Sequence, residues 1–239
     1  MKLYPAIDLY GGKAVRLLRG DYAQMTVYDE NPAALAHKFH ECGAENLHLV
    51  DLEGARSGGT PNIDRIREIV RETKLFCEVG GGIRDFSVIE AYLSAGVSRV
   101  ILGTVAVTTE GFAAEAVRRY GADKIAVGVD IRDGYVAIRG WTEKSDLPYS
   151  EFLSRLLEDG VGTVICTDIS RDGAMQGANL TLYRELMEQY PSISVVASGG
   201  VSSLDDIRAL AKIGVSGAII GKAYYTGAID LREALEAAR

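Results

Sequence analysis

The second half of this chain repeats motifs of the first half, in the same order and at the same spacing. Residues 79–83, VGGGI, return as residues 197–201, ASGGV. In each half a Gly-Val-Ser triplet begins fourteen residues after the last glycine of this motif, and a further glycine, Gly103 or Gly221, follows seven residues later. We expect one structure built from two similar halves, because each half alone would leave apolar surface exposed.

Short apolar runs alternate with amphipathic stretches along the chain. Runs of this kind are typical of strands buried on both faces of a parallel sheet. We expect eight strands, at residues 3–8, 46–51, 75–80, 99–103, 124–130, 163–168, 194–198 and 217–221. We expect helices at residues 32–42, 62–73, 87–95, 111–120, 150–158, 180–189, 204–213 and 231–238.

The number of strand–helix units decides between two α/β architectures. Eight units within 239 residues fit a (β/α)8 barrel, the TIM barrel. An open, doubly wound sheet is the alternative, but the repeat favours closure, since two four-unit halves complete one ring. We predict a single barrel over residues 1–239 with an internal half-barrel repeat, the halves being about 1–122 and 123–239.

Composition excludes several classes of protein. The net charge of −7 disfavours nucleic-acid binding. The sequence contains no apolar run of membrane-spanning length and no signal-peptide pattern, so we expect no membrane association. Three cysteines without C-x-x-C spacing are typical of reduced intracellular thiols. We therefore expect a cytoplasmic protein.

Two aspartates occupy equivalent places in the repeat. Asp8 and Asp130 end the first and fifth predicted strands, and each is followed by a glycine turn and an arginine, Arg16 or Arg139. In an eight-stranded ring these strands lie opposite each other, so the carboxylates would face across the barrel mouth. Such a pair can act as base and acid. Capping of the following turn is the alternative, which the repetition disfavours.

The glycine-rich motifs are candidate phosphate sites, because glycine lets the backbone approach a phosphate closely and a following helix supplies N–H donors. Simple turn chemistry is the alternative for one copy, but two copies at identical spacing favour phosphate binding. Neither copy has P-loop or dinucleotide-binding spacing, which disfavours ATP and NAD. The candidate residues are Gly81, Gly82, Gly103, Thr104, Gly177, Gly199, Gly200, Gly221 and Lys222.

Other polar residues are expected at the barrel mouth. Asp51 and Asp168 form another matched pair, ending the second and sixth strands. Arg171 would hold an anionic group or pair with Asp172. Trp141, the only tryptophan, would stack on a heterocycle or pack on the barrel rim.

His48 lies within the second strand and is expected to point inward. No carboxylate–histidine cluster with ligand spacing is recognisable, so we predict no metal and no cofactor.

The motifs together resemble one enzyme family over essentially the whole chain, that of the phosphoribosylformimino-aminoimidazole-carboxamide ribotide isomerases of histidine biosynthesis. The motifs that carry the resemblance are PAIDL at 5–9, VRL at 15–17, GDY at 20–22, LHLVDL at 47–52, GGGIR at 80–84, RGW at 139–141, TDISRDG at 167–173 and ASGGV at 197–201.

The resemblance implies a barrel of the ribulose-phosphate-binding type and an Amadori rearrangement of an aminoaldose to an aminoketose. It implies that Asp8 is the proton acceptor and Asp130 the proton donor, assisted by Thr167 and Asp168. The other expected substrate contacts are Arg16, Arg19, His48, Asp51, Trp141 and Arg171. The expected partner is a small ribotide with a phosphate at each end, bound by a monomer without metal or cofactor.

Three alternatives remain. The cyclase subunit of imidazole glycerol phosphate synthase shares the half-barrel repeat, but it usually has Cys at the position of Ala6. An isomerase that also accepts phosphoribosylanthranilate would share nearly all of the motifs. A non-catalytic barrel that binds a bisphosphate is the third alternative, although two carboxylates would repel its anionic ligand.

Overall fold

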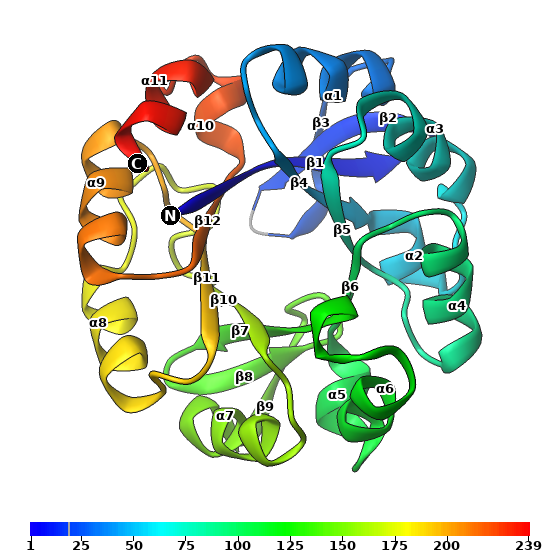
Figure 1. Ribbon diagram of the computed structural model, residues 1–239, viewed down its shortest axis with the longest axis vertical. Coiled ribbons are helices and arrows are strands. Elements are labelled where there is room, and N and C mark those ends of the chain that lie inside the picture. The colour runs from blue at the N-terminus through cyan, green and yellow to red at the C-terminus, as the bar shows by residue number, and fades with distance from the viewer. Residues whose placement is uncertain (19) are drawn as a thin grey trace.

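The computed structural model of the protein describes residues 1–18 and 20–239, without the side chain of Leu18. Eight strands close a ring in which every neighbouring pair is parallel (Figure 1). In order around the ring they are β1 (Lys2–Tyr10), β4 (Asn46–Asp51), β5 (Phe76–Gly80), β6 (Arg99–Leu102), β7 (Ile125–Arg132), β10 (Thr163–Asp168), β11 (Ser194–Ser198) and β12 (Gly217–Ile220), which pairs with β1.

Helices surround this ring (Figure 1). The larger ones are α1 (Pro32–Glu41), α3 (Ile63–Thr73), α4 (Phe86–Ser94), α6 (Phe112–Tyr120), α7 (Tyr149–Glu158), α8 (Leu180–Gln189), α9 (Leu204–Ile213) and α11 (Leu231–Ala237). Each agrees with the sequence prediction to within one residue at either end, and the predicted (β/α)8 barrel is confirmed. Among the described residues, no helix is both long enough and apolar enough to cross a bilayer.

Local sequence signals explain where several helices begin and end. Asn31 and Asp230 accept hydrogen bonds from free N–H groups in the first turns of α1 and α11. Ser203 and Asp206 form a complete capping box at the start of α9, and Gly214 ends α9 in the left-handed conformation. Such caps satisfy backbone groups that the helix itself leaves unpaired.

Apolar side chains fill two regions. The larger core lies between the ring and the helices and includes Phe39, Tyr92, Phe152 and Tyr183. A smaller apolar cluster fills the inside of the ring, with members such as Ile101, Ile165 and Ile219. The ring interior is therefore packed, and the mouth formed by the carboxyl ends of the strands is the place where a ligand can enter.

The structure contains further elements besides the eight predicted strands and the eight predicted helices. The predicted glycine turns lead into two antiparallel hairpins, formed by β2 (Lys13–Leu18) with β3 (Asp21–Asp29) and by β8 (Tyr135–Ile138) with β9 (Glu143–Pro148). Because β2 pairs with β1 and β8 pairs with β7, both barrel strands continue two residues beyond Asp8 and Asp130. The other additions are short helices: α2 (Leu52–Ser57), α5 (Thr104–Thr108), η1 (Ala122–Lys124) and α10 (Lys222–Tyr225).

Candidate active site

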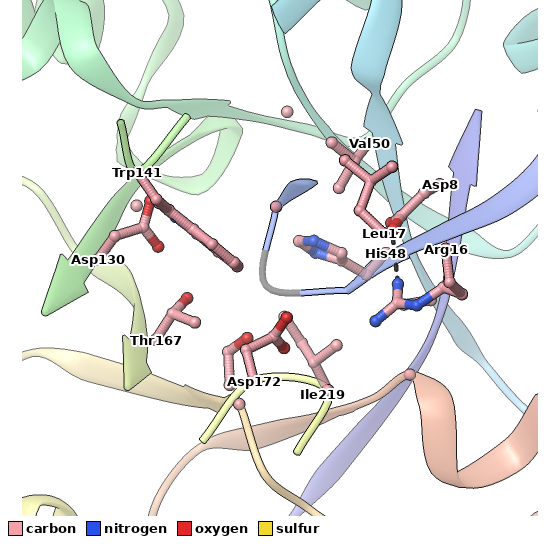
Figure 2. Close-up of a pocket in the computed structure, with 18 of the residues that line it drawn as sticks. Asp8, Arg16, Leu17, His48, Val50, Asp130, Trp141, Thr167, Asp172 and Ile219 are labelled. Atoms are coloured by element: carbon pink, nitrogen blue, oxygen red, sulfur yellow. Dashed lines mark ion pairs between the residues drawn. The ribbon is translucent and has the colours of Figure 1, made fainter. Parts of the chain in front are cut away.

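A cavity opens at the mouth of the barrel and brings most of the predicted site residues together (Figure 2). Those that line it are Asp8, Arg16, His48, Gly81, Gly103, Asp130, Trp141, Thr167, Gly199, Gly200, Gly221 and Lys222. Six predicted residues are not part of the lining: Asp51, Gly82, Thr104, Asp168, Arg171 and Gly177. Arg19, also predicted, lies outside the described residues.

Asp8 projects into this cavity from β1 and is paired with a cation. Arg16, on the adjacent strand β2, places Nη1 2.9 Å from Asp8 Oδ1. Burial alone would lower the pKa of Arg16, but the charges of Asp8 and Asp172 outweigh it and raise that pKa. The guanidinium therefore remains charged beside the Asp8 carboxylate, and an ionised carboxylate is the form that can accept a proton.

Asp130 projects from β7 on the other side of the cavity (Figure 2). Loss of solvent around this half-buried carboxyl raises its pKa. The nearby polar groups of Trp141 and Thr167 oppose this effect, and the nearby charge of Asp172 adds to it. A carboxyl with a raised pKa keeps its proton to higher pH, which suits a general acid.

The arginines after the two aspartates lie differently. The Arg16 guanidinium packs against Gly221 so closely that a Cβ at this position would overlap it. Gly103, the equivalent glycine of the first half, has open space where its Cβ would be. Arg139 is turned outward and pairs with exposed Glu143, Nη1 to Oε1 2.9 Å. The repeat is therefore broken at the site, where only one aspartate has an arginine partner among the described residues.

The structure does not support a substrate contact by Asp51. Its carboxylate is fully buried and accepts hydrogen bonds from the backbone N–H groups of Gly54 and Asn62. The Asn62 side-chain amide and the Tyr92 hydroxyl donate two more. The bonds with Gly54 and Asn62 fasten the segment between β4 and α3, and the bond with Tyr92 ties this segment to α4, so Asp51 is a structural residue.

Asp168 repeats this arrangement in the second half. Its Oδ1 accepts from the backbone and the hydroxyl of Ser170, and Oδ2 accepts from the Asn179 amide at 2.7 Å. Asn179 stands eleven residues after Asp168, as Asn62 does after Asp51. The expected direct role of Asp168 in catalysis has no support in this geometry, because its oxygens hold the loop after β10.

The other predicted residues outside the lining also hold loops together. The Thr104 hydroxyl accepts from the backbone N–H of Arg139 at 2.9 Å. Arg171 donates to the carbonyl of Gly177 at 3.1 Å and has no hydrogen bond or ion pair to Asp172 among the described residues. A Cβ at Gly82 would lie 2.6 Å from the Gly59 carbonyl oxygen, so this glycine permits close loop packing. None of these contacts reaches the cavity.

Trp141 faces the cavity from the loop between β8 and β9 (Figure 2). Gly20, in the turn between β2 and β3 of the first hairpin, lies against the indole, since a Cβ there would be 3.1 Å from the ring. The two hairpins therefore meet over the barrel mouth. This position leaves a face of Trp141 available to a heterocyclic ligand, as the stacking alternative requires.

Asp172 is a site residue that the sequence analysis missed. It lines the cavity within reach of the charges of Arg16 and Lys222. Burial raises its pKa, while the charges of Arg16 and Lys222 oppose the rise. Lys222 Nζ donates to the backbone carbonyl of Gly173 at 2.9 Å, which ties α10 to the same loop. The polar loop motif marked this region, but a loop sequence does not define which side chain turns inward.

Replacement by asparagine should have opposite effects on stability at Asp51, which holds a loop, and at Asp130, which lines the cavity. Asp51→Asn replaces an acceptor surrounded by donors, so we expect the free energy of unfolding to fall by about 3 kcal/mol. Asp130→Asn removes a carboxyl whose folded pKa is raised, so the free energy of unfolding should rise at pH 7.

Denaturant unfolding of the two variants and the parent between pH 3 and 8 measures both effects. A raised folded pKa costs stability as pH increases through the unfolded value of about 3.9. The gain in Asp130→Asn should therefore disappear towards pH 3. A loss of stability in Asp130→Asn at pH 7, equal to that in Asp51→Asn, would show that Asp130 is a structural residue as well.

Comparison with known proteins places this arrangement in a family. The family model described as histidine biosynthesis protein matches residues 2–230. A curated relative from Lactococcus lactis subsp. lactis (strain IL1403) is 50% identical over 234 residues, 98% of each chain. Its name is 1-(5-phosphoribosyl)-5-((5-phosphoribosylamino)methylideneamino)imidazole-4-carboxamide isomerase. Relatives of the same name from Ruminiclostridium cellulolyticum and Jannaschia sp. are 48% and 50% identical, and the matches cover at least 98% of each chain.

Proposed function

The chain belongs to the histidine biosynthesis protein family, and from that premise we propose that it is an isomerase, as its relatives are named, and that it performs an Amadori rearrangement. The substrate would be the ribotide aminoaldose with a phosphate at each end, and the product the phosphoribulosyl aminoketose. The observation that carries this proposal is the pair of unequal carboxylates, Asp8 and Asp130, on opposite sides of one cavity.

The first step requires an acid. The reacting sugar begins as a closed furanose, and protonation of its ring oxygen allows the C1–O bond to break, which gives a protonated imine. Asp130 suits this step because desolvation favours its protonated form. The nearby polar side chains of Thr167 and Trp141 would contact the carboxyl. Once the proton is transferred, the same two contacts stabilise the carboxylate.

The second step requires a base. Removal of the C2 proton from the imine gives an enolamine, whose tautomerisation produces the ketose. Asp8 suits this step because its carboxylate lines the cavity and is held there by the ion pair with Arg16. The positive charge of the imine acidifies C2, so a carboxylate is a strong enough base when it is correctly placed.

The phosphates would lie at the two repeated loop sets. Gly81 and Gly103 line one side of the cavity, and Gly199, Gly200 and Gly221 line the other. Gly81 and Gly199 have φ values of 103° and 87°, and a Cβ on either would overlap or crowd a neighbouring carbonyl oxygen. A side chain is therefore excluded where backbone must approach a phosphate. Lys222 and Arg16 would supply positive charge on the second side.

We also propose that the protein acts as a monomer in the cytoplasm and needs no protein partner for this reaction. All of the groups invoked come from one chain and one cavity. The unpaired cysteines Cys42, Cys77 and Cys166 are consistent with a reducing compartment.

The activity is tested by incubating the purified protein with the aminoaldose ribotide in the absence of glutamine and ammonia and following ketose formation by absorbance. We expect turnover by the parent and a loss of about 10²-fold or more in Asp8→Asn and in Asp130→Asn. Asp133→Asn, in the exposed turn before β8, is the control and should retain parental turnover. Phosphoribosylanthranilate, tested in parallel, detects a second substrate. Absence of ribotide turnover by the parent would refute the proposed activity.

The pH dependence tests Asp130 as the acid. Activity should decline as pH rises through the pKa of Asp130, because the acid form is then lost. The nearby Thr167 side chain favours the ionised form of Asp130. Thr167→Val should therefore raise that pKa and shift the alkaline limb of the kcat/KM profile upward by about one unit. An unchanged or downward-shifted limb in Thr167→Val would contradict the assignment.

A further inference from the structure

Three titratable side chains form a row inside the ring, directly beneath the cavity. His48 on β4 lies opposite Glu78 on β5, and Glu78 lies opposite Arg99 on β6. Glu78 is fully buried and Arg99 nearly so, whereas His48 reaches the cavity and lines it. The mechanism above uses neither Glu78 nor Arg99, although buried charges are costly to maintain.

Glu78 connects its two neighbours through separate oxygens. Its Oε1 lies 2.7 Å from Nδ1 of His48. Its Oε2 accepts from Nε of Arg99 at 3.0 Å and from a terminal guanidinium nitrogen of the same residue. Burial alone would raise the pKa of Glu78, but the contacts with His48 and Arg99 outweigh it and hold that pKa below its usual value. Glu78 is therefore a carboxylate, which can only accept hydrogen bonds.

Arg99 fixes this carboxylate in place. Its guanidinium also donates to the Tyr4 hydroxyl at 3.2 Å and to the Thr163 hydroxyl at 3.3 Å. The network thus joins β1, β5, β6 and β10 across the inside of the ring. A buried ion pair contributes little net stability compared with apolar residues of the same shape. The Glu78–Arg99 pair lies next to His48, which lines the cavity, so its position indicates instead a role in arranging the site.

The geometry defines the protonation of one His48 nitrogen. Because Glu78 only accepts, Nδ1 must carry the proton of their hydrogen bond. Nε2 points away from Glu78 and makes no hydrogen bond to any residue that the structure describes. Figure 2 shows the His48 ring projecting into the cavity between Asp130 and Asp8.

We propose that Glu78, anchored by Arg99, is a positioning residue that holds His48 in the Nδ1–H tautomer, so that Nε2 accepts a hydrogen bond from a sugar hydroxyl of the substrate. The sugar contact rests on the proposed isomerase function, whereas the tautomer does not. Glu78 would act only through His48, because its oxygens are occupied and it has no surface in the cavity.

Nitrogen-15 NMR of the histidine rings tests the tautomer without any substrate. The chain has three histidines, and His37 and His40 are exposed, so they serve as internal references. At a pH where the rings are neutral, His48 should show a protonated Nδ1 and an unprotonated Nε2. In Glu78→Gln the amide group can donate to Nδ1, and the proton should move to Nε2. A protonated Nε2 with a bare Nδ1 in the parent would overturn the proposal.

Kinetics test whether Glu78 acts through His48. Glu78→Gln should raise the KM for the ribotide by about tenfold with a smaller change in kcat, as for loss of one hydrogen bond to bound substrate. In a His48→Gln background the same substitution should have no further effect. Thr163→Val, which removes a different contact of Arg99, is the matched control and should keep the parental KM and ring signals.

The outcomes separate the two proposals. An equal effect of Glu78→Gln with and without His48 would show a purely structural role and refute the positioning role. If the parent has the expected tautomer but does not convert the ribotide, the isomerase function fails while the Glu78–His48 arrangement stands. Circular dichroism and denaturant unfolding of each variant identify those that fail to fold. If Glu78→Gln fails to fold, Glu78→Asp replaces it, because the shorter side chain places the carboxylate farther from Nδ1 of His48.

Discussion

The ion pair between Arg16 and Asp8 is the contact that makes two matched halves of the barrel chemically unequal. Without it, the closed ring would present two equivalent aspartates to a substrate that needs an acid and a base. Arg16 forms an ion pair with Asp8, while Asp130 loses solvent and has no arginine partner among the described residues. Enzymes commonly divide acid and base roles between carboxyls by giving them different surroundings, and here the two aspartates differ in desolvation as well as in the presence of an arginine partner.

Several of the repeated residues have structural roles and not catalytic ones. Asp51 with Asn62 and Asp168 with Asn179 hold equivalent loops at the barrel mouth, at the same spacing in both halves. These loops support the glycine-rich turns, whose backbone approaches the loop carbonyls too closely for a side chain. A rigid frame of this kind positions catalytic groups precisely, because the frame is determined before substrate binds.

The sequence predicted the barrel and its helices well because buried parallel strands and helix caps leave strong local patterns. It did not separate Asp51 and Asp168 from Asp8 and Asp130, since all four aspartates follow apolar strands. The asparagine eleven residues after each structural aspartate was an available signal. Asp172 was missed because loop side-chain directions depend on tertiary contacts. The pairing of His48 with Glu78 depends on strand register, which the sequence alone does not give.

The division of roles between Asp8 and Asp130 is tested most directly by the isotope effect on a ribotide deuterated at C2. In Asp130→Asn, ring opening should limit the residual turnover, so the effect should fall close to one. In Asp8→Asn, removal of the C2 proton should be limiting, and the effect should exceed that of the parent enzyme. The reverse pattern, with the larger effect in Asp130→Asn, would contradict the assignment of base and acid.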